Sequence, residues 1–282
     1  MIVEEIVVKH YVEISGMGKE ILIFLPGTGW AGNFGVPIAN ALNEKFTTHM
    51  IDLPGIGRSE GLEGVVDMTD AANWLNDYLE EHRIKKVTII GHSLGGGIAL
   101  SFAYNYPKKV KKLVLLDIGF AKIERFPVQM FGSVGYFLPL ISVLHRMFGQ
   151  KFLGNETQES SNNHSKEKTE EEIKAQCKSL GLEDSEFMRH AIVNQQETTL
   201  KGISLLLALY RCNMPKILNK LEVPCLILYG NRDGNTPKLQ NKIKRQVGRI
   251  KHSNITIKEL SGGHYAHVSD VRALDYLTSF LE

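Results

Sequence analysis

The segment Val87-Thr-Ile-Ile-Gly-His-Ser-Leu-Gly-Gly-Gly-Ile-Ala-Leu100 decides the fold. It contains the pattern Gly-x-Ser-x-Gly, with Ser93 at its centre, between an apolar run and a stretch suited to a helix. In that setting the serine occupies a sharp strand-to-helix turn, which exposes its hydroxyl. Gly91 and Gly95 are expected to let backbones approach closely, because a Cβ at either position would clash. The pattern is also compatible with a glycine-rich turn whose serine has no chemical role, so its context decides.

Apolar, β-branched runs alternate with amphipathic runs on both sides of this motif, which is typical of alternating strands and helices. The expected strands are residues 2–8, 10–14, 21–25, 48–52, 86–90, 112–116, 224–229 and 254–259, and the expected helices are 36–45, 68–82, 94–106, 237–247 and 270–281. Six of these strands are continuous apolar runs, as in parallel sheets that are covered on both faces. The pattern predicts an α/β fold, with a doubly wound, mostly parallel sheet of about eight strands flanked by helices.

Residues 120–221 interrupt this alternation. They contain no clear strand, but they do contain helical stretches rich in Phe and Met at 126–148, 187–194 and 200–210, together with a polar stretch at 154–172 that resembles a loop. The sequence therefore predicts a helical cap at 120–221, inserted into a core domain formed by residues 1–119 and 222–282.

Composition excludes several classes of protein. The 282 residues include 33 basic and 31 acidic side chains, giving a formal charge of +2 with no basic stripe, so a nucleic-acid partner is not expected. The N-terminus does not resemble a secretory signal, and no run approaches the ~18 apolar residues of a membrane span. Three scattered cysteines indicate reduced thiols. These features predict a cytoplasmic protein.

A serine hydroxyl needs a base to take its proton, and that base works best when a carboxylate orients it. Asp233 follows the expected strand 224–229, and His264 follows the strand 254–259. With Ser93, these residues lie past the C-terminal ends of strands, where open α/β sheets bind ligands. Taken singly, Asp233 could be a turn or helix-capping residue and His264 a surface histidine.

A dehydrogenase is a competing interpretation. Gly91-x-x-x-Gly95-x-Gly97 also resembles the phosphate-binding turn of short-chain dehydrogenases, and Tyr104 and Lys108 mimic their Tyr-x-x-x-Lys. That turn should follow the first strand, whereas several strands precede this one. Pro107 would also disrupt the helix that has to carry both side chains. Both points argue against NAD(P) binding.

The chain resembles the α/β-hydrolase fold superfamily everywhere outside residues 120–221. The segments that carry this resemblance are Leu25-Pro-Gly-Thr-Gly29, Asp52-Leu-Pro-Gly-Ile-Gly-Arg-Ser59, Gly91-His-Ser-Leu-Gly95, Gly230-Asn-Arg-Asp233 and Gly263-His264. The resemblance implies Ser93 as nucleophile, Asp233 as acid and His264 as base, with the backbone N–H groups of Thr28 and Leu94 as oxyanion donors. Asp117, at the end of the strand 112–116, lies where some family members place the acid, so it is the alternative acid. Pro26 departs from the family pattern, because a His-Gly pair normally begins at that position.

These observations together predict a serine hydrolase of carboxylic esters that forms an acyl-enzyme and needs neither cofactor nor metal. The expected substrate is a small, apolar ester-like molecule, and candidate pocket residues on the cap are Phe126, Met130, Phe131, Tyr136 and Phe137. The same aromatic run is equally compatible with packing inside the cap. The same fold also supports C–C bond, thioester and amide hydrolysis and haloperoxidase-like chemistry. A ligand-binding receptor that retains the triad is the alternative from another class.

Overall fold

The computed structural model describes residues 8–128, 132–154 and 168–282. Its strands form one sheet in the order β1-β3-β2-β4-β5-β6-β7. The strands are β1 Val12–Ser15, β2 Glu20–Leu25, β3 Phe46–Ile51, β4 Val87–His92, β5 Val110–Leu116, β6 Cys225–Gly230 and β7 Ile255–Leu260. Strand β1 runs antiparallel to β3, and the other neighbouring strands are parallel. The predicted doubly wound α/β fold is confirmed.

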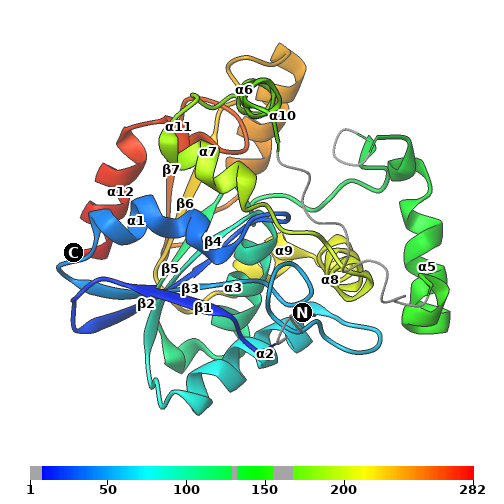
Figure 1. The fold of residues 1–282 in the computed structure, drawn as a ribbon, viewed down its shortest axis with the longest axis horizontal. Coiled ribbons are helices and arrows are strands. Elements are labelled where there is room, and N and C mark those ends of the chain that lie inside the picture. The colour runs from blue at the N-terminus through cyan, green and yellow to red at the C-terminus, as the bar shows by residue number, and fades with distance from the viewer. Residues whose placement is uncertain (1–7, 129–131, 155–167) are drawn as a thin grey trace.

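Helices cover both faces of this sheet (Figure 1). In β2, Leu22 and Phe24 pack into the core shared with α1 and α12, whereas Ile23 and Leu25 pack into the core shared with α2, α3 and α10. All four side chains are fully buried, which explains why the strand is a continuous apolar run. The helices on the two faces are α1 Val36–Ala41, α2 Met68–Glu81, α3 Ser93–Asn105, α10 Pro237–Val247, α11 Ala266–Ser269 and α12 Arg272–Leu281.

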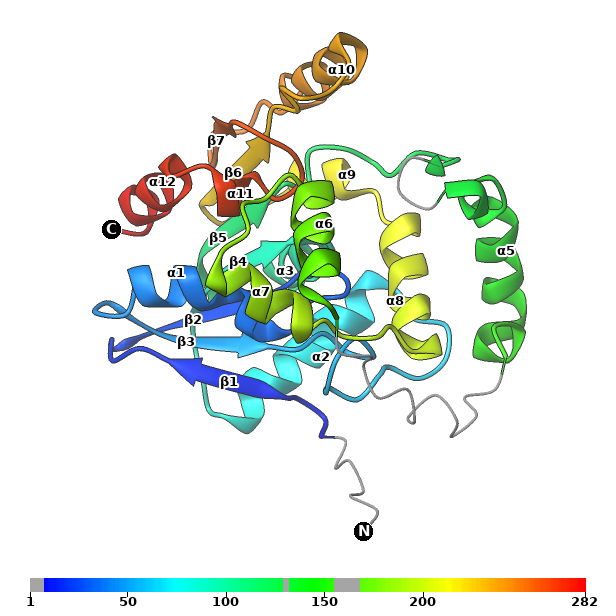
Figure 2. The ribbon, with the colours of Figure 1, turned by 45° about the horizontal axis from the view of Figure 1, so that its top comes forward.

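The chain between β5 and β6 forms the cap helices, which lie beside the carboxyl ends of the strands (Figure 2). They are α5 Leu138–Phe148, α6 Glu170–Leu180, α7 Glu186–Val193, α8 Leu200–Arg211 and α9 Met214–Leu218. Helices α6 and α7 share the core of α1 and α12, whereas α8 and α9 share the core of α2 and α3. Helix α5 lies at the margin of the molecule, beyond α8, in both views.

The structure differs from the predicted elements at a few places. Seven strands are described rather than about eight, because the expected strand 2–8 lies almost wholly outside the described residues. Helix α6 begins inside the stretch 154–172, which was predicted as a loop. Thr169 caps this helix, and Glu172 completes the reciprocal capping box. No helix among the described residues is both long enough and apolar enough to cross a bilayer.

Candidate active site

Ser93 lies at the junction of β4 and α3. The strand ends at His92, the helix begins at Ser93, and the serine backbone has a φ of 51°. Close packing imposes this turn. The Gly95 N–H donates to the Pro26 carbonyl over 3.0 Å, and a Cβ on Gly95 would lie only 2.3 Å from that oxygen. The expected role of Gly95 in close backbone approach is therefore seen directly, and the turn exposes part of the serine side chain.

Asp117 is the carboxylate that contacts His264. It follows β5 directly, and its Oδ2 atom lies 2.5 Å from Nδ1 of His264. Its other oxygen, Oδ1, accepts a hydrogen bond from the Gly230 N–H over 3.0 Å. The carboxyl group is buried, whereas the imidazole is 35% exposed. A buried carboxylate thus holds a histidine that remains accessible to a reacting molecule.

The guanidinium of Arg232 also binds Asp117. Nη2 lies 2.5 Å from Oδ2 of the carboxylate, and Nη1 lies 3.0 Å from Oδ1. Burial alone would raise the pKa of Asp117, but the contacts with His264 and Arg232 outweigh it, so the pKa lies below its ordinary value. Asp117 is therefore ionised at neutral pH and accepts hydrogen bonds from both side chains.

Backbone strain is concentrated at this site. Four non-glycine residues in the described part of the chain have positive φ, and three of them are Ser93, Asp117 and Arg232, at 51°, 56° and 59°. Left-handed backbone costs a non-glycine residue about 1–2 kcal/mol, and such strain is common at functional sites. The surrounding fold holds Ser93, Asp117 and Arg232 in this conformation.

The structure does not bring Asp233, the predicted acid, to His264. Asp233 is exposed in the loop between β6 and α10, and its backbone N–H donates to Oδ1 of Asn231 over 3.0 Å. Its neighbour Arg232 points inward instead and binds Asp117. The prediction of an Asp233–His264 pair is thus corrected in favour of Asp117, the alternative acid, because the loop conformation turns the arginine rather than the aspartate toward the histidine.

The two predicted oxyanion donors, Thr28 and Leu94, belong to two different segments next to Ser93. Leu94 is the second residue of α3, and first-turn N–H groups have no partner within their own helix. Thr28 lies in the loop after β2, between Gly27 and Gly29. A Cβ on Gly27 would lie 3.2 Å from the Ser93 Cβ, so this loop packs against the serine. The loop backbone can therefore approach a group bound to Ser93.

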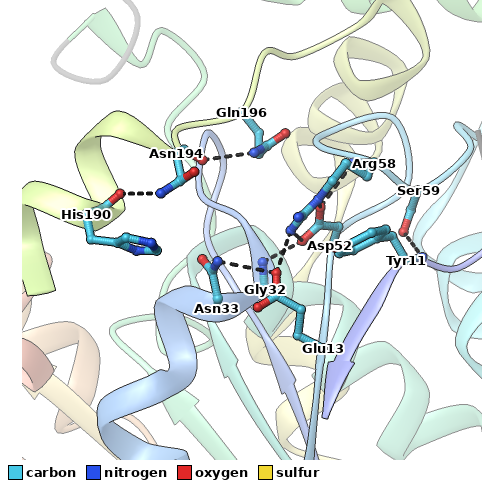
Figure 3. A network of polar contacts seen from close by, with 10 residues as sticks. All are labelled: Tyr11, Glu13, Gly32, Asn33, Asp52, Arg58, Ser59, His190, Asn194 and Gln196. Atoms are coloured by element: carbon cyan, nitrogen blue, oxygen red, sulfur yellow. Dashed lines mark hydrogen bonds and ion pairs between the residues drawn. The ribbon is translucent and has the colours of Figure 1, made fainter. Parts of the chain in front are cut away.

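An ion pair between a buried aspartate and a partly exposed arginine anchors the far end of this loop (Figure 3). Asp52 is fully buried, and its Oδ1 accepts a hydrogen bond from the Gly32 N–H over 2.6 Å. Its Oδ2 lies 2.8 Å from Nε of Arg58, whose Nη2 also lies 2.9 Å from Oε1 of Glu13. The Arg58 guanidinium stacks 3.6 Å from the centre of the Tyr11 ring. These contacts fix the position of Gly32 and thus of the loop that carries Thr28.

The cap holds the same loop from the other side. The Gln196 N–H, in the segment between α7 and α8, donates to the Gly29 carbonyl over 3.0 Å. The Gln196 side chain in turn donates to the Asn194 carbonyl over 2.9 Å, as Figure 3 shows. The loop beside Ser93 is therefore shared between the sheet domain and the cap.

Two further histidines pack against His264 and its neighbours. His92 Nε2 lies 3.1 Å from the His264 carbonyl, and the rings of His92 and His267 are 4.5 Å apart. Burial, reinforced by the charges of neighbouring histidines, lowers the pKa of His92 far below its ordinary value and that of His267 to about 3. Both rings are neutral at neutral pH, and they support the loop that carries His264.

Comparison with known proteins identifies the family of this chain. The model of the alpha/beta hydrolase fold family matches residues 20–271. The chain belongs to this family. A thermophilic esterase from Thermogutta terrifontis has the same fold, with a TM-score of 0.63 at 19% identity over 96% of this chain and 92% of that one. The family match shows that the chain has the alpha/beta hydrolase fold.

Curated relatives match only part of this chain. An uncharacterised protein of Mycobacterium bovis is 37% identical over 106 residues, which are 38% of this chain and 31% of that protein. A 2-hydroxy-6-oxononadienedioate/2-hydroxy-6-oxononatrienedioate hydrolase of Paraburkholderia phymatum is 34% identical over 116 residues, 39% of this chain and 40% of that protein. The chain thus matches about a third to two fifths of the length of these relatives.

The described residues that were predicted to line an acyl pocket are exposed. Phe126, Tyr136 and Phe137 expose 47%, 62% and 61% of their surface, so they are not packed inside a closed pocket. Met130 and Phe131 lie outside the described residues. The aromatic stretch was expected to face inward, but α5 buries Leu138, Ser142 and His145, whereas Phe148 at its end and Phe137 just before it are exposed.

Two residues that support the candidate site, Arg232 and Gln196, were not predicted from the sequence. Arg232 was quoted only as part of the segment around Asp233, although a cation next to a candidate acid is a signal for an ion pair with another carboxylate. Gln196 carried no signal, because its contact with Gly29 is made by the backbone N–H, which every residue except proline possesses.

Proposed function

We propose that this protein is a serine hydrolase that cleaves carboxylic esters through an acyl-enzyme on Ser93, with His264 as the base and Asp117 as the acid. The observation that carries the proposal is the 2.5 Å contact between Nδ1 of His264 and the buried Asp117 carboxylate. A carboxylate in that position fixes the tautomer whose Nε2 atom can accept a proton, and it stabilises the imidazolium that forms.

The proposed reaction has two halves. The Ser93 Oγ attacks the ester carbonyl carbon while Nε2 of His264 takes the hydroxyl proton. The C–O bond to the alcohol then breaks, and the alcohol leaves with the proton from His264. In the second half, His264 takes a proton from water, the hydroxide attacks the acyl carbon, and the acid leaves as the proton returns to Ser93.

The negative oxygen of each tetrahedral intermediate would accept hydrogen bonds from the N–H groups of Thr28 and Leu94. Removal of one such donor typically costs about 3 kcal/mol of transition-state stabilisation. Support for this role comes from the packing of Gly27 against Ser93 and from the two anchors of the loop, Gly32 and Gly29. Under this proposal, residues 120–221 act as the cap over a core domain of residues 1–119 and 222–282.

A second candidate is hydrolysis of a different carbonyl compound at the same triad. It is favoured by the relative whose name gives 2-hydroxy-6-oxononadienedioate as a substrate. Both candidates need an activated Ser93, so the nucleophile is tested first and the substrate second.

The test combines active-site labelling with a substrate panel. We expect a fluorophosphonate probe to label the wild-type protein on Ser93, and p-nitrophenyl esters of rising chain length to be hydrolysed. Ser93→Ala should lose both reactions. Activity that survives in Ser93→Ala would contradict the mechanism. A labelled serine without ester turnover would favour the second candidate, and absence of labelling and turnover would favour a ligand-binding receptor.

A further inference from the structure

Helix α5 has an unusual distribution of side chains. Its apolar face, defined here as Phe137, Leu140, Val143, Met147 and Phe148, is exposed to between 55% and 69%. At 3.6 residues per turn these positions occupy less than half of the helix circumference. The opposite side is buried and partly polar, since Nε2 of His145 lies 2.9 Å from Oγ of Ser204 on α8. An ordinary surface helix buries its apolar side, whereas α5 exposes this side to solvent.

The exposed apolar surface extends beyond the helix itself. Nine of the 17 large apolar side chains that are exposed among the described residues lie between positions 126 and 152. The four outside the apolar face of α5 are Phe126, Val134, Tyr136 and Phe152. Monomeric soluble proteins rarely expose large apolar patches, and such a concentration of exposed apolar side chains in one segment usually marks a protein or membrane contact. Four of the nine side chains are Phe, and one is Tyr.

The charges around the apolar face distinguish a membrane partner from a protein partner. Residues 126–154 include no Asp or Glu, but they include Arg146 and Lys151, both of which are exposed. Lys122 and Arg125 precede the segment, and the nearby Glu124 is engaged in an ion pair with Lys242 of α10. Within the described residues, neither Arg146 nor Lys151 forms an ion pair with a carboxylate. The patch is therefore apolar in its centre and positive at its margins.

We propose that the apolar face of α5 docks onto the surface of an anionic lipid bilayer. Exposed Phe, Leu and Met side chains flanked by Arg and Lys are the composition of helices that lie in the membrane interface. A helix of 11 residues is about 16 Å long, so it fits along the interface rather than across the hydrocarbon layer. A second copy of the chain fits less well, because a two-fold contact would press two positive patches together.

This docking surface is independent of the bond that Ser93 cleaves, so its test needs no substrate. The full chain is mixed with vesicles made of equal parts phosphatidylglycerol and phosphatidylcholine, and bound protein is measured by flotation. We expect binding that weakens as salt is added and that is weaker on vesicles of phosphatidylcholine alone.

Variants identify the surface. Leu140→Ser combined with Met147→Ser should weaken vesicle binding by at least about tenfold, since two apolar groups no longer enter the interface. Arg146→Gln combined with Lys151→Gln should weaken binding to the anionic vesicles by about 20-fold and leave binding to phosphatidylcholine unchanged. Met17→Ser is the matched control, because Met17 is also exposed, at 86%, but lies between β1 and β2. It should bind as the wild type does.

Folding and turnover are measured on the same variants. All substituted side chains are exposed, so the melting temperatures and the hydrolysis of p-nitrophenyl acetate should match those of the wild type. Absence of wild-type binding to the anionic vesicles at low salt would overturn the proposal, as would normal binding by the Leu140→Ser/Met147→Ser variant. Sedimentation that shows a dimer, lost in that variant, without vesicle binding would assign the face to a second copy and overturn it as well.

Discussion

The Nδ1 atom of His264 lies 2.5 Å from Oδ2 of Asp117, although 147 positions separate the two residues in the chain. Strand β5 supplies the aspartate and the loop after β7 supplies the histidine, while β4, the neighbour of β5, leads to Ser93. The acid and the nucleophile candidate therefore come from adjacent strands of the sheet.

Substitution of the two aspartates distinguishes the acids. We expect Asp117→Asn to lower kcat/KM for p-nitrophenyl esters roughly a thousandfold or more, because the amide favours the wrong tautomer of His264. Asp233→Asn should stay within about twofold of the wild type, because its exposed side chain makes no contact with the site. Near-UV circular dichroism checks that both variants keep the native packing. A large loss in Asp233→Asn with a normal Asp117→Asn would restore the acid predicted from sequence.

The backbone of Ser93 predicts an ordering of stability. With φ at 51°, any side chain at this position is strained, whereas glycine is not. We therefore expect Ser93→Gly to be more stable than Ser93→Ala by about 1 kcal/mol in urea unfolding, although both should be inactive. Equal stability of the two variants would show that the turn relaxes when the hydroxyl is removed.

The ion pair of Asp52 and Arg58 predicts that stability and turnover fall together when the pair is broken. Asp52→Asn keeps the shape of a fully buried side chain but removes its charge, so we expect a loss of about 3 kcal/mol in the free energy of unfolding. Turnover should also fall, because an amide has a single acceptor oxygen and cannot hold both Arg58 and the Gly32 N–H as the carboxylate does. Glu13→Gln is the control, because Glu13 contacts the same arginine from a partly exposed position and should cost less than about 1 kcal/mol. Similar losses in both variants would contradict this assignment.

His49 predicts how stability depends on pH. Burial, with a smaller effect from the charge of His82, lowers the pKa of His49 to about 4, and its Nδ1 lies 2.7 Å from the Tyr78 hydroxyl. The unfolded chain takes up this proton near pH 6.5, whereas the folded protein resists it until about pH 4. The free energy of unfolding is therefore unaffected by His49 titration above pH 6.5. As the pH drops from 6.5 to 4, it decreases by about 1.4 kcal/mol per pH unit, because only the unfolded chain takes up the proton.

Urea unfolding at several pH values tests this dependence. We expect His49→Gln to show a flatter decline than the wild type over that window, since the variant has one fewer group to titrate. His190→Gln, which changes an exposed histidine, should follow the wild type. If all three proteins decline in parallel, His49 does not contribute to the acid sensitivity.

The sheet and the positions of Ser93 and His264 were predictable because their signals are local. A continuous apolar run specifies a strand buried on both faces, and glycines next to Ser93 specify its turn. The identity of the acid was not local. Asp117 and Asp233 each follow a buried strand, and the choice between them depends on whether the loop after β6 turns Arg232 or Asp233 inward.

The cap shows a second limit of sequence reasoning. Helical periodicity in α5 reveals which side chains share a face, but not whether that face is buried, and Phe137 was assigned to a pocket for that reason. Helix α6 was missed because its polar composition resembled a loop, although Thr169 and Glu172 form a capping box that marks its first turn.

The hydrogen bond from Gln196 to Gly29 has a consequence for protein engineering. A chimaera that exchanges residues 120–221 for the insertion of another family member would also exchange one clamp on the loop next to Ser93. A chimaera that keeps the original segment between α7 and α8 should therefore acquire the new substrate preference. The loop that carries Thr28 should keep its geometry.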